Sequence, residues 1–260
     1  MIEVEGLTKE YPATRRTPKK RAIDGVTFRC APGQVYALLG PNGAGKTSTL
    51  RIIATTLAPT AGSVRVGGFG LDRPDDVRRS IGFLTGNTAP YGRLTAREVI
   101  VYFGRLFGVA EASLHPRVEE LAQRLDMEEF LDRRCDKLSM GQKQKVGIAR
   151  TIVHDPPVLI LDEPTAGLDV LAARAIIELV RGCRAAGKTV LFSTHVMAEA
   201  QKLADRVGVL FEGRLIADAP PAGILAQTGA PDLEEAFLAL IADPGGAPAR
   251  AAGVSSSSSS

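Results

Sequence analysis

A glycine-rich loop of eight residues is the part of this sequence with the clearest chemical meaning. Residues 40–47 fit the pattern Gly-x-x-x-x-Gly-Lys-Ser/Thr without a mismatch. The loop follows the apolar run Val35–Leu39 and precedes a helical pattern, so it would bring a phosphate to the free N–H groups and positive dipole of a helix start. Its glycines let the backbone approach that phosphate closely. The sequence therefore predicts a nucleotide phosphate site, the alternative being a glycine-rich turn before a helix.

Two side chains of this loop have specific predicted tasks. Lys46 would reach the β- and γ-phosphates of a nucleoside triphosphate. The hydroxyl of Thr47 would bind Mg²⁺. The residues predicted to bind the nucleotide here are Gly40, Pro41, Asn42, Gly43, Ala44, Gly45, Lys46, Thr47 and Ser48.

Two adjacent carboxylates follow a second apolar run. Residues 158–161 are all aliphatic and of buried-strand length, and Asp162 and Glu163 come directly after them. Successive side chains on a strand point in opposite directions, so the two acids can hold different tasks. Asp162 would orient Mg²⁺ and its water, and Glu163 would polarise the water that attacks the γ-phosphate. The alternative is a solvated acidic pair at the start of a loop.

Three further motifs resemble those of the ATP-binding cassette (ABC) family. Residues 138–142, Leu-Ser-Met-Gly-Gln, resemble its signature, with Met140 where glycine is commonest. Residues 164–169 resemble its D-loop, and residues 193–195, Ser-Thr-His, resemble its switch histidine at a strand end. The likeness runs from about residue 2 to residue 241, with the motifs in the family's order. The resemblance implies an ATP hydrolase that uses ATP and Mg²⁺.

The resemblance also implies tasks for single residues. Tyr11 is placed like the aromatic that stacks on adenine, and His195 like the residue that bonds the γ-phosphate and supports Glu163. In this family two cassettes pack head to tail, and each signature covers the ATP of the other copy. Ser139 stands where a helix N-cap belongs, so its hydroxyl and the helix start would face that phosphate. The residues expected to bind ATP across such a dimer are Ser139, Gly141 and Gln142.

One position departs from the family's pattern. After residues 81–85 the family usually has a glutamine that touches Mg²⁺ or the lytic water, and this chain has Gly86 there. Asn87 is an amide one residue later, with a side chain shorter by one methylene. The same region joins the cassette to its membrane partner in this family, and a glycine there would serve as a hinge.

Shorter stretches at residues 83–86, 91–94 and 143–146 look like the ATP-binding subunits of NatA-type sodium exporters. They imply that the chain powers export of sodium ions or of a small hydrophobic, drug-like cargo. The chain would work on the cytoplasmic face of the cell membrane, and the cargo would pass through a separate integral permease. Cargo contacts lie on that other polypeptide. One alternative is a soluble cassette acting on nucleic acid or ribosomes, but the duplicated cassettes, long coiled coils and zinc-binding cysteines of those branches do not appear. A second alternative is a regulatory module with little turnover, which the missing glutamine keeps open.

Composition agrees with a transporter ATPase. The chain has 260 residues, 45% of them hydrophobic, and a net charge of +3, too balanced to indicate nucleic acid. Cys30, Cys135 and Cys183 are widely spaced, as expected for buried, reduced thiols in the cytosol. No run approaches the roughly eighteen apolar residues of a membrane span, and the N-terminus lacks a signal-peptide pattern. A basic run at residues 15–21 is expected to be a solvated loop, and any transmembrane part would be a separate chain.

The elements that must position these motifs can also be predicted. Short strands at residues 2–6, 26–30, 35–39 and 63–66 suggest an antiparallel lobe folded against the nucleotide core. Residues 95–132 are helical in pattern and should pack as a subdomain of about residues 90–155. The apolar stripe predicted to pack in its core is Val99, Tyr102, Phe103, Leu106 and Phe107.

The rest of the chain completes one predicted domain. A helix should run from Ser139 to about residue 153, a hairpin from 206 to 216, and an amphipathic helix from 232 to 241. The predicted fold is α/β: a P-loop NTPase of the ABC cassette type, with a RecA-like core, an antiparallel β lobe and a helical subdomain over residues 1–242. Residues 243–260 are rich in Ala, Gly, Pro and Ser and are predicted to be disordered.

Overall fold

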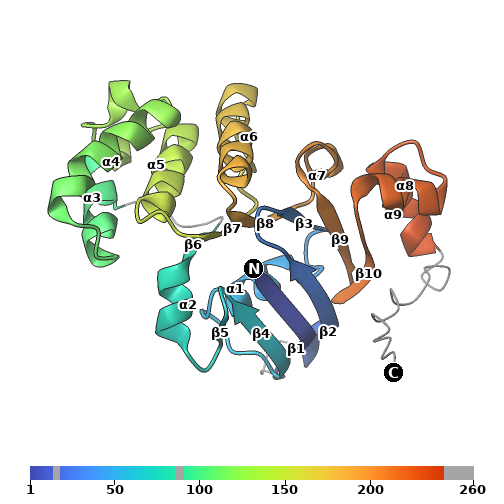
Figure 1. Cartoon of the computed structure of the whole chain (residues 1–260). Coiled ribbons are helices and arrows are strands. Elements are labelled where there is room, and N and C mark those ends of the chain that lie inside the picture. The colour runs from blue at the N-terminus through green and yellow to red at the C-terminus, as the bar shows by residue number, and fades with distance from the viewer. Residues whose placement is uncertain (14–17, 86–90, 243–260) are drawn as a thin grey trace, which may run out of the picture.

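A computed structural model of the chain describes residues 1–13, 18–85 and 91–242, which form both strands and helices (Figure 1). The predictions for Gly86, Asn87 and the tail from residue 243 lie outside these residues. The described strands are β1 (Ile2–Tyr11), β2 (Lys20–Cys30), β3 (Val35–Leu39), β4 (Ala61–Val66), β5 (Phe69–Gly70), β6 (Ile81–Leu84), β7 (Val158–Asp162), β8 (Thr189–Thr194), β9 (Arg206–Phe211) and β10 (Arg214–Ala219). The described α-helices are α1 (Lys46–Ile53), α2 (Pro74–Ser80), α3 (Ala96–Leu106), α4 (Glu111–Arg124), α5 (Met140–Ile152), α6 (Val170–Ala185), α7 (Met197–Leu203), α8 (Pro221–Thr228) and α9 (Leu233–Ala242).

The strands form two sheets. The first has the order β2-β1-β4-β5 and is antiparallel. The second has the order β10-β9-β3-β8-β7-β6, in which β3 is parallel to both β8 and β9, and β7 is parallel to both β6 and β8. Strand β10 joins its edge as the predicted antiparallel hairpin with β9. Parallel strands end at the same edge of a sheet, so the residues after β3, β7 and β8 are brought together.

The prediction that residues 35–39 belong to the antiparallel lobe is wrong. They form β3, in the middle of the parallel sheet, and all five are buried. A short, continuously apolar strand without alternation is typical of a parallel strand covered on both faces. The other lobe strands are confirmed but longer than predicted, since β1 extends to Tyr11, β2 begins at Lys20 and β4 begins at Ala61.

The start of β2 also corrects the expected basic loop. Residues 14–17 lie outside the description, whereas Lys20 and Arg21 already belong to β2. The guanidinium of Arg21 pairs with Glu10 at 2.8 Å and with Asp24 at 2.9 Å. Lys20 and Arg21 therefore belong to the first sheet rather than to a loop.

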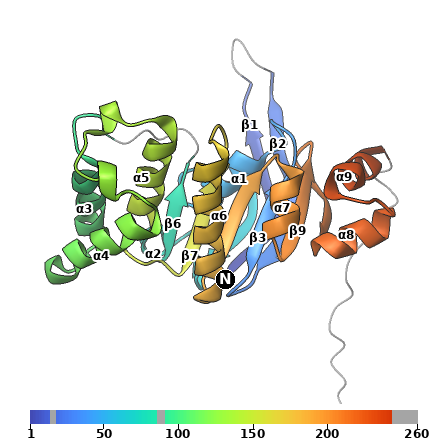
Figure 2. The same cartoon turned by 90° about the horizontal axis from the view of Figure 1, so that it is seen from above.

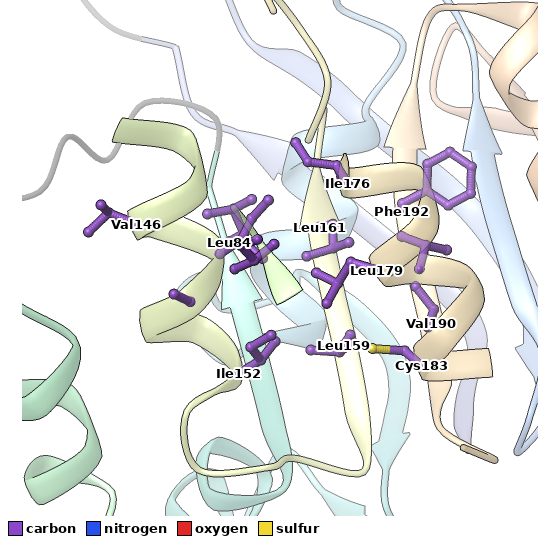
Figure 3. Packing of buried hydrophobic residues seen from close by; sticks show 14 of the residues in the cluster. Leu84, Val146, Ile152, Leu159, Leu161, Ile176, Leu179, Cys183, Val190 and Phe192 are labelled. Atoms are coloured by element: carbon purple, nitrogen blue, oxygen red, sulfur yellow. The ribbon is translucent and has the colours of Figure 1, made fainter. Parts of the chain in front are cut away.

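Strand β3 separates two hydrophobic clusters. Its residues 35, 37 and 39 face the cluster under α3 to α7, and residues 36 and 38 face the cluster that joins the two sheets around α1. Figure 3 shows α5 and α6 packing on the sheet, with Ile152 beside Leu159 and Leu179 beside Leu161. The three cysteines are buried and unpaired, as predicted, and burial raises the pKa of Cys30 to about 12.

The helices cover the sheet as three groups (Figure 2). Helices α3, α4 and α5 lie at one end of the molecule, α8 and α9 at the other, and α6 and α7 between them. Helices α5 and α9 match the predicted segments after Ser139 and around residues 232–241. Among the helices described, none has the length and apolar character needed to cross a bilayer.

The predicted core stripe on α3 is wrong for most of its residues. Val99 is fully buried, but the exposed fractions of Tyr102, Leu106 and Phe107 are 50%, 65% and 37%. Helix α3 packs against α4 and α5, and of the expected stripe only Val99 and, in part, Phe103 contribute to the core. The residues that α3 buries are Ala96, Val99, Ile100, Val101 and Gly104. The helix is therefore apolar on a second face that its own fold does not cover.

Candidate nucleotide-binding site

The loop after β3 is shaped by contacts that only glycine permits. A Cβ added to Gly40 would lie 2.1 Å from the carbonyl oxygen of Leu210, and one added to Gly45 would lie 2.4 Å from that of Ala22. Gly43 and Gly45 have φ values of +83° and +110°, a region that side-chain-bearing residues rarely adopt. The loop therefore lies pressed on the neighbouring backbone, and its N–H groups open into the space at the start of α1.

The start of α1 suits an anion. Gly45 is its N-cap, and no side chain caps the first N–H groups. A cavity of about 190 Å³ lies over it. The lining residues are Tyr11, Lys20, Ala22, Asn42, Gly43, Gly45, Lys46, Thr47, Ser48 and Glu163. Of the other predicted loop residues, Ala44 packs its side chain in the core, and Gly40 and Pro41 offer carbonyl groups to Lys46.

Lys46 is held inside this loop. Its side chain is 4% exposed, and its ammonium donates to the carbonyl oxygens of Gly40 at 2.7 Å and Pro41 at 3.1 Å. The same nitrogen lies 3.4 Å from a carboxylate oxygen of Glu163. A phosphate oxygen is a strong acceptor for such a cation, so the loop fits the phosphate chain of a nucleotide.

Asp162 and Thr47, the residues predicted to hold the metal, are in contact with each other. The carboxylate of Asp162 is buried and accepts from the Thr47 hydroxyl at 3.2 Å and from the Ser193 hydroxyl at 2.6 Å. Hard oxygen ligands of this kind are the ones that Mg²⁺ takes in nucleotide sites, so the residues fit the ion. Ser193, which the sequence analysis noted only within a motif, fixes the orientation of Asp162.

Glu163 points away from Asp162 for a reason that differs from the predicted one. Strand β7 ends at Asp162, and Glu163 has a φ of +47°, in the left-handed region. Its N–H donates to the hydroxyl of Ser193 at 3.0 Å, which holds this unusual conformation. The carboxylate then lies between the ammonium of Lys46 and Nδ1 of His195, which is 3.2 Å away. The turn, rather than strand alternation, separates the two acids.

Tyr11 lies at the edge of the same cavity. Its exposed fraction is 37%, and its hydroxyl is 3.1 Å from that of Ser48. The ammonium of Lys9 lies 5.4 Å from the centre of the ring. A half-exposed aromatic face beside a phosphate loop can stack on a base.

The signature residues lie in a different hollow. Ser139 is the N-cap of α5, as predicted: its hydroxyl accepts from the Gln142 N–H at 3.2 Å, and its own N–H donates to the Gln142 side chain at 3.0 Å. Ser139, Gly141 and Gln142 line a cavity of about 770 Å³ together with Asp169 and Arg174. This hollow shares no lining residue with the cavity over α1. One chain therefore brings Tyr11, the phosphate loop, the two acids and His195 together, and keeps the signature apart.

A third hollow was missed by the sequence analysis. It has a volume of about 560 Å³, lies between β6 and the helices α3 and α5, and includes part of the exposed stripe of α3. His154, which had no motif around it, stacks on Phe107 with ring centres 3.9 Å apart. The aromatic and other residues that line this third hollow include Phe83, Tyr91, Phe103, Leu106, Phe107 and His154. The apolar character of α3 on more than one face is the sequence feature that could have indicated this hollow.

The strand order and the loop before α1 define the class of this protein. Strand β3 delivers the loop, its neighbour β8 carries His195, and β7 carries Asp162, so the chemical groups converge at one edge of a parallel sheet. This is a P-loop nucleotide-binding protein.

Comparison with known proteins narrows the class. The family described as "ABC transporter" matches residues 23–166. The chain is 36% identical over 243 residues to the ABC transporter ATP-binding protein NatA of Bacillus subtilis (strain 168), covering 93% of this chain and 98% of that protein. It is 40% identical over 237 residues to the Nod factor export ATP-binding protein I of Paraburkholderia xenovorans (strain LB400), covering 91% and 76%. The chain belongs to the ABC transporter family.

A solved structure shares the fold. It is the dimeric post-hydrolysis state of the ATP-binding cassette MJ0796 bound to ADP and Pi, with a TM-score of 0.76 and 27% identity over 85% of this chain and 98% of that one. The predicted cassette fold and the family resemblance are confirmed. The chain is thus an ATP-binding cassette of the ATP hydrolase class, rather than a soluble cassette that works on nucleic acid.

Proposed function

We propose that this chain is the ATP-hydrolysing subunit of an exporter, working on the cytoplasmic face of the cell membrane through a separate integral permease. One observation carries the proposal: the carboxylate of Glu163 lies between Lys46 and His195 at the mouth of the phosphate loop. The names of the relatives support export, since one is a Nod factor export protein. Sodium ions or a small hydrophobic molecule are the proposed cargo.

The residues then have distinct tasks in hydrolysis. Lys46 and the loop N–H groups hold the β- and γ-phosphates, and Tyr11 stacks on the adenine. Thr47 and Asp162 would hold Mg²⁺, which would supply positive charge against the phosphate oxygens. When a phosphate replaces Glu163 as the partner of Lys46, the carboxylate is released to take a proton from the attacking water. His195, which contacts Glu163, would keep that carboxylate oriented and would bond the γ-phosphate.

The proposal requires two copies of the chain. The signature hollow with Ser139, Gly141 and Gln142 is separate from the cavity over α1, so each signature would cover the ATP of the other copy. The dimeric cassette to which this chain is similar supports such a pairing. Loss of the γ-phosphate would remove the group that joins the two halves and let them part.

The permease would bind at the hollow beside α3. Phe103, Leu106 and Phe107 line it with the apolar residues of β6, and Leu106 and Phe107 keep exposed surface. An apolar face of this kind accepts a short amphipathic helix of a partner. Thr85 also lines this hollow. It is the last described residue before the segment that joins the cassette to its membrane partner in this family. We propose that residues 1–242 form the cassette, with a helical subdomain at about residues 90–155.

The substitution Glu163→Gln tests this function. It keeps the size of the side chain and should leave ATP binding within about twofold, while phosphate release falls by about a hundredfold or more, the usual weight of a general base. With ATP and Mg²⁺ the variant should elute as a dimer, because the composite site can close and no longer opens. The control is Glu234→Gln, on the exposed start of α9. Unchanged phosphate release by Glu163→Gln would refute the assignment of Glu163, whereas little release by the parent chain would favour the module with little turnover.

A further inference from the structure

Glu199 joins two loops that carry the proposed chemistry. It lies in the first turn of α7, and one of its carboxylate oxygens, Oε2, accepts from the hydroxyl of Thr165 at 2.8 Å and from that of Thr194 at 3.2 Å. Thr165 stands two residues after Glu163, and Thr194 stands directly before His195. A single side chain from outside both motifs therefore connects the loop after β7 to the end of β8.

The Thr194 hydroxyl is fully committed to this contact. Its oxygen accepts from the N–H of Val196 at 2.9 Å, and its single proton is donated to Glu199. Thr194 is 2% exposed, so water does not compete freely for that proton. Hydrogen bonds to a carboxylate are stronger than those between neutral groups. The backbone on either side of Thr194 is thereby fixed, including the residue that presents the His195 ring.

The same carboxylate fixes the segment after Glu163. Glu163 has a left-handed backbone, and such a conformation persists only where its surroundings hold it. Ser193 holds the N–H of Glu163 on one side, and Glu199 holds the Thr165 side chain on the other. Glu163, Thr165, Thr194, His195 and Glu199 all line one hollow of about 540 Å³. The contacts form a closed ring, because Glu163 and His195 also touch each other at 3.2 Å.

We propose that Glu199 is a positioning residue for ATP hydrolysis. By binding Thr165 and Thr194 together, it keeps the carboxylate of Glu163 and the ring of His195 paired in front of Lys46. The inference rests on the proposed function, because it takes Glu163 and His195 to act at the γ-phosphate. The competing explanation is that Glu199 merely stabilises α7, as an acid in the first turn of any helix does.

Kinetics of the purified full chain with Mg²⁺ and ATP separate these explanations. Glu199→Ala should lower kcat by about tenfold to a hundredfold, since displacing a catalytic group by about 1 Å has effects of this size. The KM for ATP should stay within about twofold, because the phosphate loop makes no contact with Glu199. Glu199→Gln keeps an oxygen that can accept both hydroxyl groups, so it should restore kcat to within about threefold of the parent chain.

Glu234→Ala is the matched control for helix stability. Glu234 is an exposed acid in the first turn of α9, as Glu199 is in α7. Glu234→Ala removes a first-turn charge that lacks the two threonine contacts of Glu199, so it should leave kcat unchanged. Thr194→Val should reduce kcat by itself and cost less in the Glu199→Ala background, since both changes break the Thr194–Glu199 contact and only the Val196 contact remains to be lost.

Each result bears on one proposal. The role of Glu199 is overturned if Glu199→Ala keeps kcat within twofold of the parent, if Glu199→Gln is as impaired as Glu199→Ala, or if the Thr194→Val loss simply adds. If Glu199→Ala does not fold, kcat is compared between Glu199→Gln and Thr194→Val, each checked for folding by circular dichroism. A kcat near that of the parent in Glu199→Gln and a reduced kcat in Thr194→Val would support the role of Glu199, and any other pair of results would overturn it. If Glu163→Gln is inactive while Glu199→Ala is fully active, the Glu199 inference alone fails. If the parent chain itself releases no phosphate with Mg²⁺ and ATP, the proposed function fails.

Discussion

Ser139 would have two tasks that one substitution separates. In the free chain it caps α5 reciprocally with Gln142, through contacts of 3.2 and 3.0 Å. Replacing a serine N-cap by alanine lowers the free energy of unfolding by about 0.5–2 kcal/mol. In a domain of this size each kcal/mol is about 2–4 °C in Tm, so Ser139→Ala should lower Tm by about 1–8 °C.

The second task appears only in the nucleotide-bound dimer. There the Ser139 hydroxyl would donate its proton to the γ-phosphate held by the other copy, while its oxygen keeps the Gln142 N–H. A hydrogen bond to a charged group contributes about 1.5–3 kcal/mol. Its loss should lower kcat/KM by about 10-fold to 150-fold, at about 1.4 kcal/mol for each factor of ten. The assay is phosphate release against ATP concentration, with the dimer followed by size-exclusion chromatography in the Glu163→Gln background.

Thr95 provides the matched control. It caps α3 through the same reciprocal box: its hydroxyl accepts from the Glu98 N–H at 3.1 Å, and its own N–H donates to the Glu98 carboxylate at 2.8 Å. Thr95→Ala should therefore lower Tm as much as Ser139→Ala but leave phosphate release unchanged. Ser139→Thr, which keeps a hydroxyl, should recover most activity. Equal losses of activity in the two alanine variants, or full activity in Ser139→Ala, would refute the task across the dimer.

Three further outcomes are expected. Tyr11→Ala should weaken ATP binding by about 5-fold to 150-fold in a fluorescence titration, which corresponds to about 1–3 kcal/mol for base stacking. Tyr11→Phe keeps the ring and should bind ATP normally. Equal affinity of the two variants for ATP would contradict stacking. Leu106→Glu should abolish recovery of the chain with membranes containing the permease but keep its ATPase activity. The control Leu238→Glu, at a 50% exposed leucine of α9, should change neither property. If Leu106→Glu is still recovered with the membranes, the hollow beside α3 is excluded as the docking site. Chelation of Mg²⁺ by EDTA should stop phosphate release, and added Mg²⁺ should restore it; turnover that persists in EDTA would contradict the tasks given to Thr47 and Asp162.

Local chemistry made part of the site predictable. The loop at residues 40–47, the strand that ends at Asp162 and the N-cap Ser139 each depend on a few consecutive residues, because glycine conformation, strand length and capping are local properties. The loop and Asp162 lie together because parallel strands end at one edge of the sheet, whereas Ser139 lies in a separate hollow. Among the predicted strands, only β3 was assigned to the wrong sheet.

The remaining features depend on tertiary contacts. Which face of α3 is buried is decided by where α4 and α5 lie, and the spacing of Tyr102 and Leu106 is the same on a covered or an uncovered face. The left-handed turn at Glu163 is held by Ser193, thirty residues away, which no local pattern of Glu163 encodes. Glu199 reaches Thr165 across thirty-four residues, and glutamate in a first helical turn is too common to indicate a tether.

Because the two halves of the proposed pocket lie in separate hollows of one chain, dilution should silence the ATPase without unfolding it. Two free cassettes at nanomolar concentration would rarely meet, whereas two cassettes fixed to one membrane scaffold experience an effective concentration that can reach about millimolar. A scaffold that holds the pair would then act as an activator through geometry alone. ATP consumption would be confined to assembled pumps, and surplus subunits would stay idle.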